Sequence, residues 1–142
     1  MKGDDMRRIN KMFVTGLFLS ALIGVSGSFG VAASPTTRTN SGGGVTVKVT
    51  RLDSKANGDL RFQVVLDTHS VDLGAYDLKK ITILRDRSAN VYHPTAVENK
   101  GSGHHRSATV TFARPANGTK QVELVIKDIA GVKERVFQWE LE

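Results

Sequence analysis

Short segments in which apolar and polar residues alternate dominate the chain from residue 45 onward. In "VTVKVT" (45–50) every second residue is valine, and "LRFQVVL" (60–66) repeats the two-residue period with larger side chains. This period, with many β-branched and aromatic residues, is typical of β-strands that have one buried face. Turn-forming residues separate the segments. The pattern predicts seven strands, at 45–52, 59–68, 79–86, 91–97, 105–113, 120–128 and 134–141.

Seven short strands between residues 45 and 142 predict an all-β fold, a single immunoglobulin-like antiparallel β-sandwich. Each sheet would bury one face against the other and expose the opposite face to water. The segment 91–97 contains Pro94, which cannot donate a ladder hydrogen bond, so it is expected at a sheet edge. Trp139 falls on the last strand and is expected in the core.

The N-terminal residues 1–33 have the features of a signal peptide. A positively charged start is followed by an uncharged apolar run, residues 13–33, that ends in Val31-Ala32-Ala33. Small residues at these positions predict cleavage after Ala33 and export to the periplasm, the cell surface or the medium. The alternative is an uncleaved membrane anchor, because the uncharged run is long enough to span a bilayer.

Residues 34–44, "SPTTRTNSGGG", contain no large apolar side chain and are expected to form a flexible linker. The chain has no cysteine, which excludes disulfides, thiolate metal sites and a cysteine nucleophile. Its net charge of +6 is spread along the chain, with no block of like charges of the kind that binds nucleic acid.

The order of the strands predicts where the polar loop residues meet. In a sandwich of antiparallel neighbours, successive connections alternate between the two ends, so the second, fourth and sixth share one end. That end would gather the connections 69–78, 98–104 and 129–133, with Asp67 just below them. The residues that we expect there are His69, Asp72, Asp77, His104, His105 and Asp128, and Arg106 follows directly after the fourth connection.

Two functions fit such an end. Imidazole and carboxylate groups suit copper(II) or zinc, which would make His69, His104 and His105 candidate metal ligands. Their spacing matches no metal motif, and the alternative is a polar loop whose side chains satisfy its own backbone. A protein-binding surface would instead present an exposed aromatic patch, around Tyr76 or Tyr92. No nucleophile elbow or phosphate loop is present, so we expect no enzymatic activity.

The segments "LRFQVVLDTHSVDL" (60–73), "GHHRSATVTF" (103–112) and "VELVIKDIAGVKERVFQWEL" (122–141) resemble a family of small exported bacterial immunoglobulin-like domains. The resemblance covers most of the chain that would follow the signal peptide, and the family carries no catalytic assignment that could be transferred to this chain. It points to the His-Ser-Val-Asp-Leu and Gly-His-His-Arg segments, which contain His69, Asp72, His104, His105 and Arg106.

Together these features predict an exported, monomeric, non-enzymatic binding or accessory module that presents loops at one end of a β-sandwich. Its partner would be a protein or an anionic envelope polymer, which Arg85 and Arg106 could contact. The alternative is a periplasmic copper- or zinc-binding protein that uses the loop histidines and aspartates.

Overall fold

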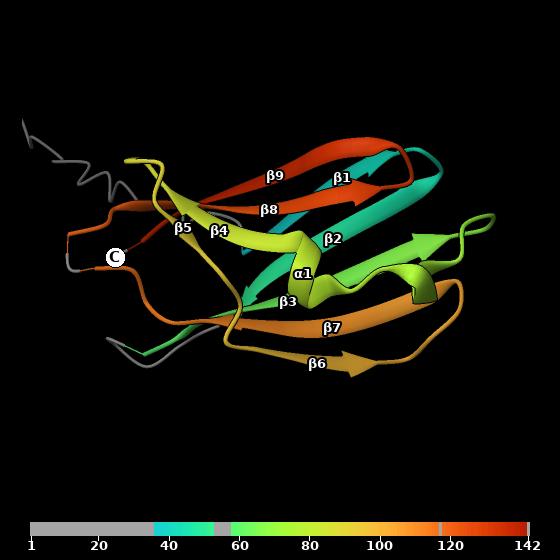
Figure 1. The fold of residues 1–142 in the computed structure, drawn as a ribbon, viewed down its shortest axis with the longest axis horizontal. Coiled ribbons are helices and arrows are strands. Elements are labelled where there is room, and N and C mark those ends of the chain that lie inside the picture. The colour runs from blue at the N-terminus through green and yellow to red at the C-terminus, as the bar shows by residue number, and fades with distance from the viewer. Residues whose placement is uncertain (1–35, 53–57, 117, 142) are drawn as a thin grey trace, which may run out of the picture. The chain divides into compact units, whose positions relative to one another are not determined.

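The computed structural model describes residues 36–52, 58–116 and 118–141, which form two antiparallel β-sheets (Figure 1). The first sheet has the strand order β1-β2-β3-β7-β6, and the second has the order β5-β4-β8-β9. The predicted β-sandwich is confirmed, with nine strands in the described ranges instead of seven. The elements are β1 (Thr37–Gly42), β2 (Val45–Leu52), β3 (Leu60–Thr68), η1 (Leu73–Ala75), α1 (Leu78–Ile81), β4 (Thr82–Asp86), β5 (Val91–Tyr92), β6 (Ala96–Lys100), β7 (His105–Phe112), β8 (Gln121–Ile129) and β9 (Val132–Glu140).

The core lies between the two sheets and uses the alternating positions that the sequence predicts. In β3, and in β2 as far as Val49, every second residue is buried, and the intervening residues are exposed or half-buried. The ring centroid of Phe62 lies 6.1 Å from that of Phe112 and 5.0 Å from that of Trp139, so strands of both sheets meet through aromatic contacts. Trp139 is only 2% exposed, as expected for a core residue.

Most of the expected linker is a strand. Residues 34–44 include β1, which pairs antiparallel with β2 along its whole length. The hydroxyl groups of Thr37 and Thr50 hydrogen-bond across this pair at 2.9 Å. Gly43 and Gly44 form the connection with φ angles of 59° and 75°, which a two-residue hairpin turn requires. The linker prediction was wrong because it considered only apolar burial, whereas backbone pairing and hydroxyl contacts order this segment.

The expected strand 91–97 is split at Pro94. Its first part, β5, pairs with β4 in the four-stranded sheet, and its second part, β6, pairs with β7 in the five-stranded sheet. Each part is an edge strand, as the proline predicts, and the buried Pro94 lies where the chain crosses between the sheets. The predicted strand at 79–86 begins later than expected, because Leu78–Ile81 forms the short helix α1.

The segment expected as a signal peptide, residues 1–33, lies outside the described residues. None of the helices in the ranges that the structure describes is long and apolar enough to cross a bilayer.

Candidate functional site

Four connections meet at one end of the sandwich, at the right of Figure 1. The Thr68 amide donates to the His104 carbonyl oxygen (3.0 Å), and the Ala130 amide donates to the Tyr76 phenol oxygen (3.0 Å). The second, fourth and sixth of the expected connections therefore share an end. We call this end the loop pole, defined as residues 43–44, 69–78, 101–104 and 130–131.

Arg106 holds the longest of these connections in place. From β7, its Nη1 donates to the carbonyl oxygens of Leu73 (2.8 Å) and Tyr76 (2.6 Å), and its Nη2 donates to Asn99 Oδ1 (2.7 Å). Backbone carbonyl groups outside regular helices and sheets lack main-chain donors, so other groups must supply their hydrogen bonds. The guanidinium group offers several N–H donors in a fixed planar geometry. Arg106 is therefore occupied inside the protein, and an anionic ligand would have to displace these contacts.

Asp72 and Asp77 each begin a short helix. Asp72 Oδ1 accepts from the Gly74 amide (2.9 Å) at the start of η1, and Asp77 Oδ1 accepts from the Lys79 amide (3.1 Å) at the start of α1. Asp77 also forms an exposed ion pair with Lys80 at 3.6 Å. These contacts are the usual N-cap interactions of aspartate. Both carboxylates thus shape the loop pole locally.

The three candidate histidines are all exposed. His105 Nδ1 lies 2.5 Å from Asp67 Oδ1 on the outer face of the five-stranded sheet, where the two residues are register partners. His104 precedes the strand in the turn, and His69 follows β3. In the ranges that the structure describes, no three His, Cys, Asp or Glu side chains gather closely enough to hold a metal ion. The structure therefore does not assemble the predicted copper or zinc site.

Asp128 lies near the end of β8, two residues before the β8–β9 turn, and is exposed. Its φ of 54° is in the left-handed region, as is that of Ala130 in the turn (52°). Aspartate tolerates this conformation better than most residues with a Cβ atom. Asp128 thus lies beside the β8–β9 turn, at the predicted end of the domain.

The expected aromatic patch is not formed by the tyrosines. Tyr76 and Tyr92 are both half-buried and pack against the core. The Tyr76 hydroxyl accepts from the Ala130 amide, and the Tyr92 hydroxyl donates to Asp86 Oδ2 at 3.0 Å. Each ring therefore stabilises a connection instead of offering a free aromatic surface.

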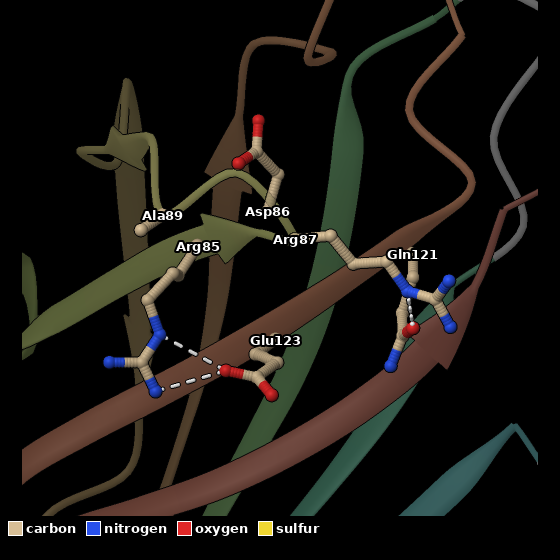
Figure 2. Close-up of a pocket in the computed structure, with 6 residues that line it drawn as sticks. All are labelled: Arg85, Asp86, Arg87, Ala89, Gln121 and Glu123. Atoms are coloured by element: carbon tan, nitrogen blue, oxygen red, sulfur yellow. Dashed lines mark hydrogen bonds and ion pairs between the residues drawn. The ribbon is translucent and has the colours of Figure 1, made fainter.

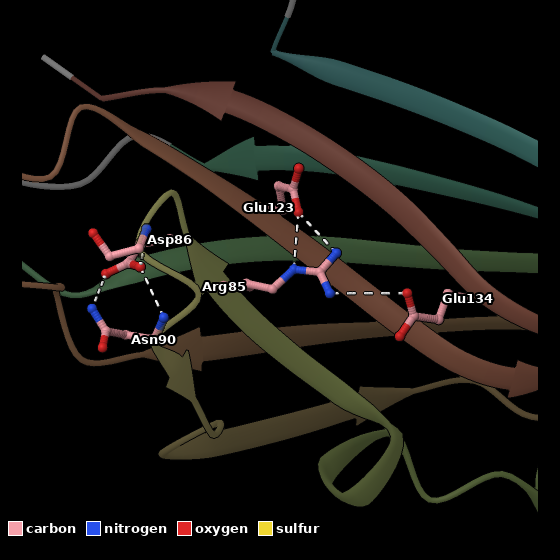
Figure 3. A network of polar contacts seen from close by, with 6 residues as sticks. Arg85, Asp86, Asn90, Glu123 and Glu134 are labelled. Carbon is pink, nitrogen blue, oxygen red and sulfur yellow. Dashed lines mark hydrogen bonds and ion pairs between the residues drawn. The ribbon is translucent and has the colours of Figure 1, made fainter.

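The opposite end of the sandwich carries a shallow depression of about 340 Å³, lined by Arg85, Asp86, Arg87, Ala89, Gln121 and Glu123 (Figure 2). Glu123 Oε2 accepts from Arg85 Nε (3.0 Å) and lies 2.9 Å from its Nη2, and Glu134 Oε2 lies 4.0 Å from Nη1 (Figure 3). Arg87 donates to the side chain of Gln121. Arg85 is therefore neutralised and poorly suited to the anionic ligand expected from the sequence.

Asp86 organises the β4–β5 turn beside this depression. Its carboxylate accepts from the amides of Ser88 and Asn90 (2.9 Å each) and from Asn90 Nδ2 (2.8 Å). Hydrogen bonding, chiefly from the Asn90 side chain, lowers the pKa of Asp86, although partial desolvation opposes this shift. Burial, with a smaller contribution from Asp86, raises the pKa of the Tyr92 phenol. The turn is a tightly bonded structural unit.

Sequence reasoning missed a buried cation. Arg135 on β9 is 0% exposed and donates to Asn40 Oδ1 (2.8 Å) and to the Gly42 carbonyl oxygen (2.6 Å). The two-residue period of this strand predicts that Arg135 faces inward, because Arg135 precedes the inward-facing Phe137 by two residues and shares its face. The sequence could not show which acceptors would surround it.

The chain matches no known family model, no curated protein and no solved structure in the three comparisons made. At the loop pole, the ordered connections leave the imidazoles of His69 and His104 and the carboxylates of Asp72 and Asp77 exposed to solvent.

Proposed function

We propose that this chain is an exported, non-enzymatic binding module with an immunoglobulin-like β-sandwich, and that the loop pole is its recognition surface. The observation that carries the proposal is the set of contacts made by Arg106, which orders residues 69–78 from inside. His69, Asp72 and His104 remain exposed on the ordered loops. A surface that is ordered before binding loses less conformational entropy on association.

The chemistry of the loop pole favours a polar partner. Its exposed groups include the imidazoles of His69 and His104, the carboxylates of Asp72 and Asp77, and the hydroxyls of Ser70 and Ser102. The two tyrosines of the chain are half-buried and pack against the core. Without residues 1–33, 16 Lys and Arg exceed 12 Asp and Glu by four, and this net charge of +4 would draw an anionic envelope polymer by long-range attraction. A partner protein would have to offer polar side chains that match the exposed groups. The proposal covers these two partners, and the experiment below distinguishes them.

Site-specific photo-crosslinking tests the proposal. A photoreactive residue is placed at His69 or at His104 in the full chain, which is then incubated with the envelope fraction of the source organism. The matched control carries it at His93, an exposed histidine between β5 and β6. We expect a discrete adduct from positions 69 and 104 and none from position 93, and protease digestion of the adduct identifies a protein partner. Equal labelling at position 93, or no adduct from the loop pole, contradicts the proposal.

A periplasmic copper or zinc function is the second candidate, and the contact between His105 and Asp67 favours it. It supplies two ligands, and water would complete the coordination of the ion. Calorimetric titration with copper(II), zinc and calcium compares the full chain, the His104→Ala/His105→Ala double variant and the control His93→Ala. Micromolar binding that only the double variant loses would support this function, and the absence of heat in all three would remove it.

A further inference from the structure

The edge strands β1 and β9 lie on the same side of the sandwich, one in each sheet, and side chains bridge them. Arg135 reaches from β9 to Asn40 and Gly42 of β1. In the opposite direction, Arg38 Nε of β1 donates to the Gln138 carbonyl oxygen (3.3 Å). Through these contacts β1 covers one side of the guanidinium of Arg135.

Every acceptor that Arg135 reaches is neutral. The acceptors are the Asn40 side-chain amide and the carbonyl oxygens of Gly42 and Ile129, the last at 3.4 Å. None of the ion pairs that join described residues includes Arg135, and its buried Nε finds no hydrogen-bond partner among them. Burial lowers the pKa of the guanidinium, which nevertheless stays charged in proteins. A buried cation without a counter-charge favours a carboxylate ligand.

The strand that covers this cation contributes no apolar side chain to the core. All six residues of β1 are exposed or half-buried, and none carries a large apolar side chain. Its hydroxyl contacts with β2, such as Ser41 to Thr46 at 2.9 Å, are exposed. Strands β2 and β3, by contrast, bury apolar side chains at alternate positions, up to Val49 in β2 and Leu66 in β3. Removal of β1 would therefore open the edge of β2 without removing apolar side chains from the core.

We propose that the edge of β2 beneath β1 is an acceptor site for an extended segment of a partner protein, which carries an Asp or Glu at the position of Asn40. The segment would pair antiparallel with β2 in the register of β1 and place its carboxylate against Arg135. This site is distinct from the loop pole and goes beyond the function proposed above.

Backbone pairing and charge have separate roles at this site. Six register pairs connect β1 to β2, so an incoming strand of similar length can replace the same main-chain hydrogen bonds. These bonds provide affinity for any extended segment. The 2.8 Å contact between Arg135 Nη1 and Asn40 Oδ1 provides the selection, because a carboxylate there would form a charge-assisted hydrogen bond.

The test uses the full chain, the Asn40→Ala variant and labelled peptides with blocked ends. The parent peptide is TTRTNSGG, the sequence of residues 36–43, and two others carry Asp or Lys at the position of Asn40. Fluorescence anisotropy measures binding. We expect the Asp peptide to bind Asn40→Ala at least tenfold more tightly than the parent peptide and to bind the unaltered chain more weakly. The Lys peptide should bind least. Equal affinities for the three peptides, or no binding to either protein, would overturn the proposal.

A second measurement is independent of peptide binding and of whether Asn40→Ala folds. In the Asn40→Asp variant, the chain's own β1 carries the carboxylate that the proposal requires. Hydrogen exchange of residues 37–42 should be at least threefold slower in Asn40→Asp than in the unaltered chain, with no change in β3. Unchanged or faster exchange in β1 would show that Arg135 does not select a carboxylate.

Discussion

Replacement of Arg106 by Met should loosen the loop pole and leave the rest of the sandwich intact. Three hydrogen bonds from the guanidinium are lost, two to carbonyl oxygens of the 69–78 connection and one to Asn99. A hydrogen bond to a charged group contributes about 1.5–3 kcal/mol when buried. Because Arg106 is only half-buried and water can reach part of the site, we expect a total loss of about 2–4 kcal/mol.

Urea denaturation measures this loss. At an m value of about 2 kcal/mol/M, the middle of the range for small domains, the unfolding midpoint should fall by about 1–2 M. Hydrogen exchange should accelerate in residues 69–78 and stay unchanged in β8. Arg106→Lys should lie between the two proteins, because one ammonium group cannot reproduce the planar geometry of three donor contacts.

Arg61→Met is the matched control. Arg61 is exposed on the neighbouring strand β3, so its replacement should change the unfolding free energy by less than about 0.5 kcal/mol. If Arg106→Met were as stable as this control, with unchanged exchange in residues 69–78, the guanidinium would not order the loop pole. The main support for the proposed recognition surface would then be lost.

Three further predictions concern the core, a turn and the response to pH. Phe62→Ala should destabilise the fold by about 3–5 kcal/mol in urea titrations, because a fully buried ring that contacts two other aromatic rings is removed. Gly43→Ala should cost more stability than Gly103→Ala; both have positive φ, but a Cβ at Gly43 would lie 2.1 Å from a carbonyl oxygen, whereas Gly103 has open space. Hydrogen bonding, chiefly from Asn90, lowers the pKa of Asp86, so its carboxylate stabilises the fold above the ordinary aspartate pKa. The advantage of the unaltered chain over Asp86→Asn should shrink as the pH falls through the folded-state pKa, measured at about pH 7, 4 and 2. An equal effect of the two glycine variants, a difference for Asp86→Asn that does not depend on pH, or a Phe62→Ala loss below about 1 kcal/mol would each contradict the reasoning.

The strands that bury apolar side chains could be predicted from the sequence, because alternation reports burial directly. β2, β3 and β7 appear close to their expected positions, and the parity of the connections placed the loop pole correctly. β1 could not be found in this way, since its Thr, Asn, Ser and Gly residues bury no apolar surface and are ordered by pairing with β2. The split at Pro94 was foreseeable as an edge position but not as a crossing between sheets.

The candidate site could be predicted as a place but not as a set of contacts. Sequence order brings the histidines and aspartates to one end, yet it does not show where each side chain points. Asp72 and Asp77 are used as helix caps, and His105 meets Asp67 instead of another histidine. The alternation in β7 places Arg106 on the inward face, but its carbonyl acceptors come from a connection without a periodic pattern.

The directions of β1 and β9 place both ends of the described domain away from the loop pole. β1 runs toward the loop pole and β9 runs away from it, so residues 36 and 141 both lie at the opposite end (Figure 1). A strand of eight residues such as β2 spans about 26 Å at about 3.3 Å per residue. Residues 36 and 141 therefore lie about the length of one strand from the loop pole. His69 and His104 are exposed at the end of the described domain that is farthest from these two residues.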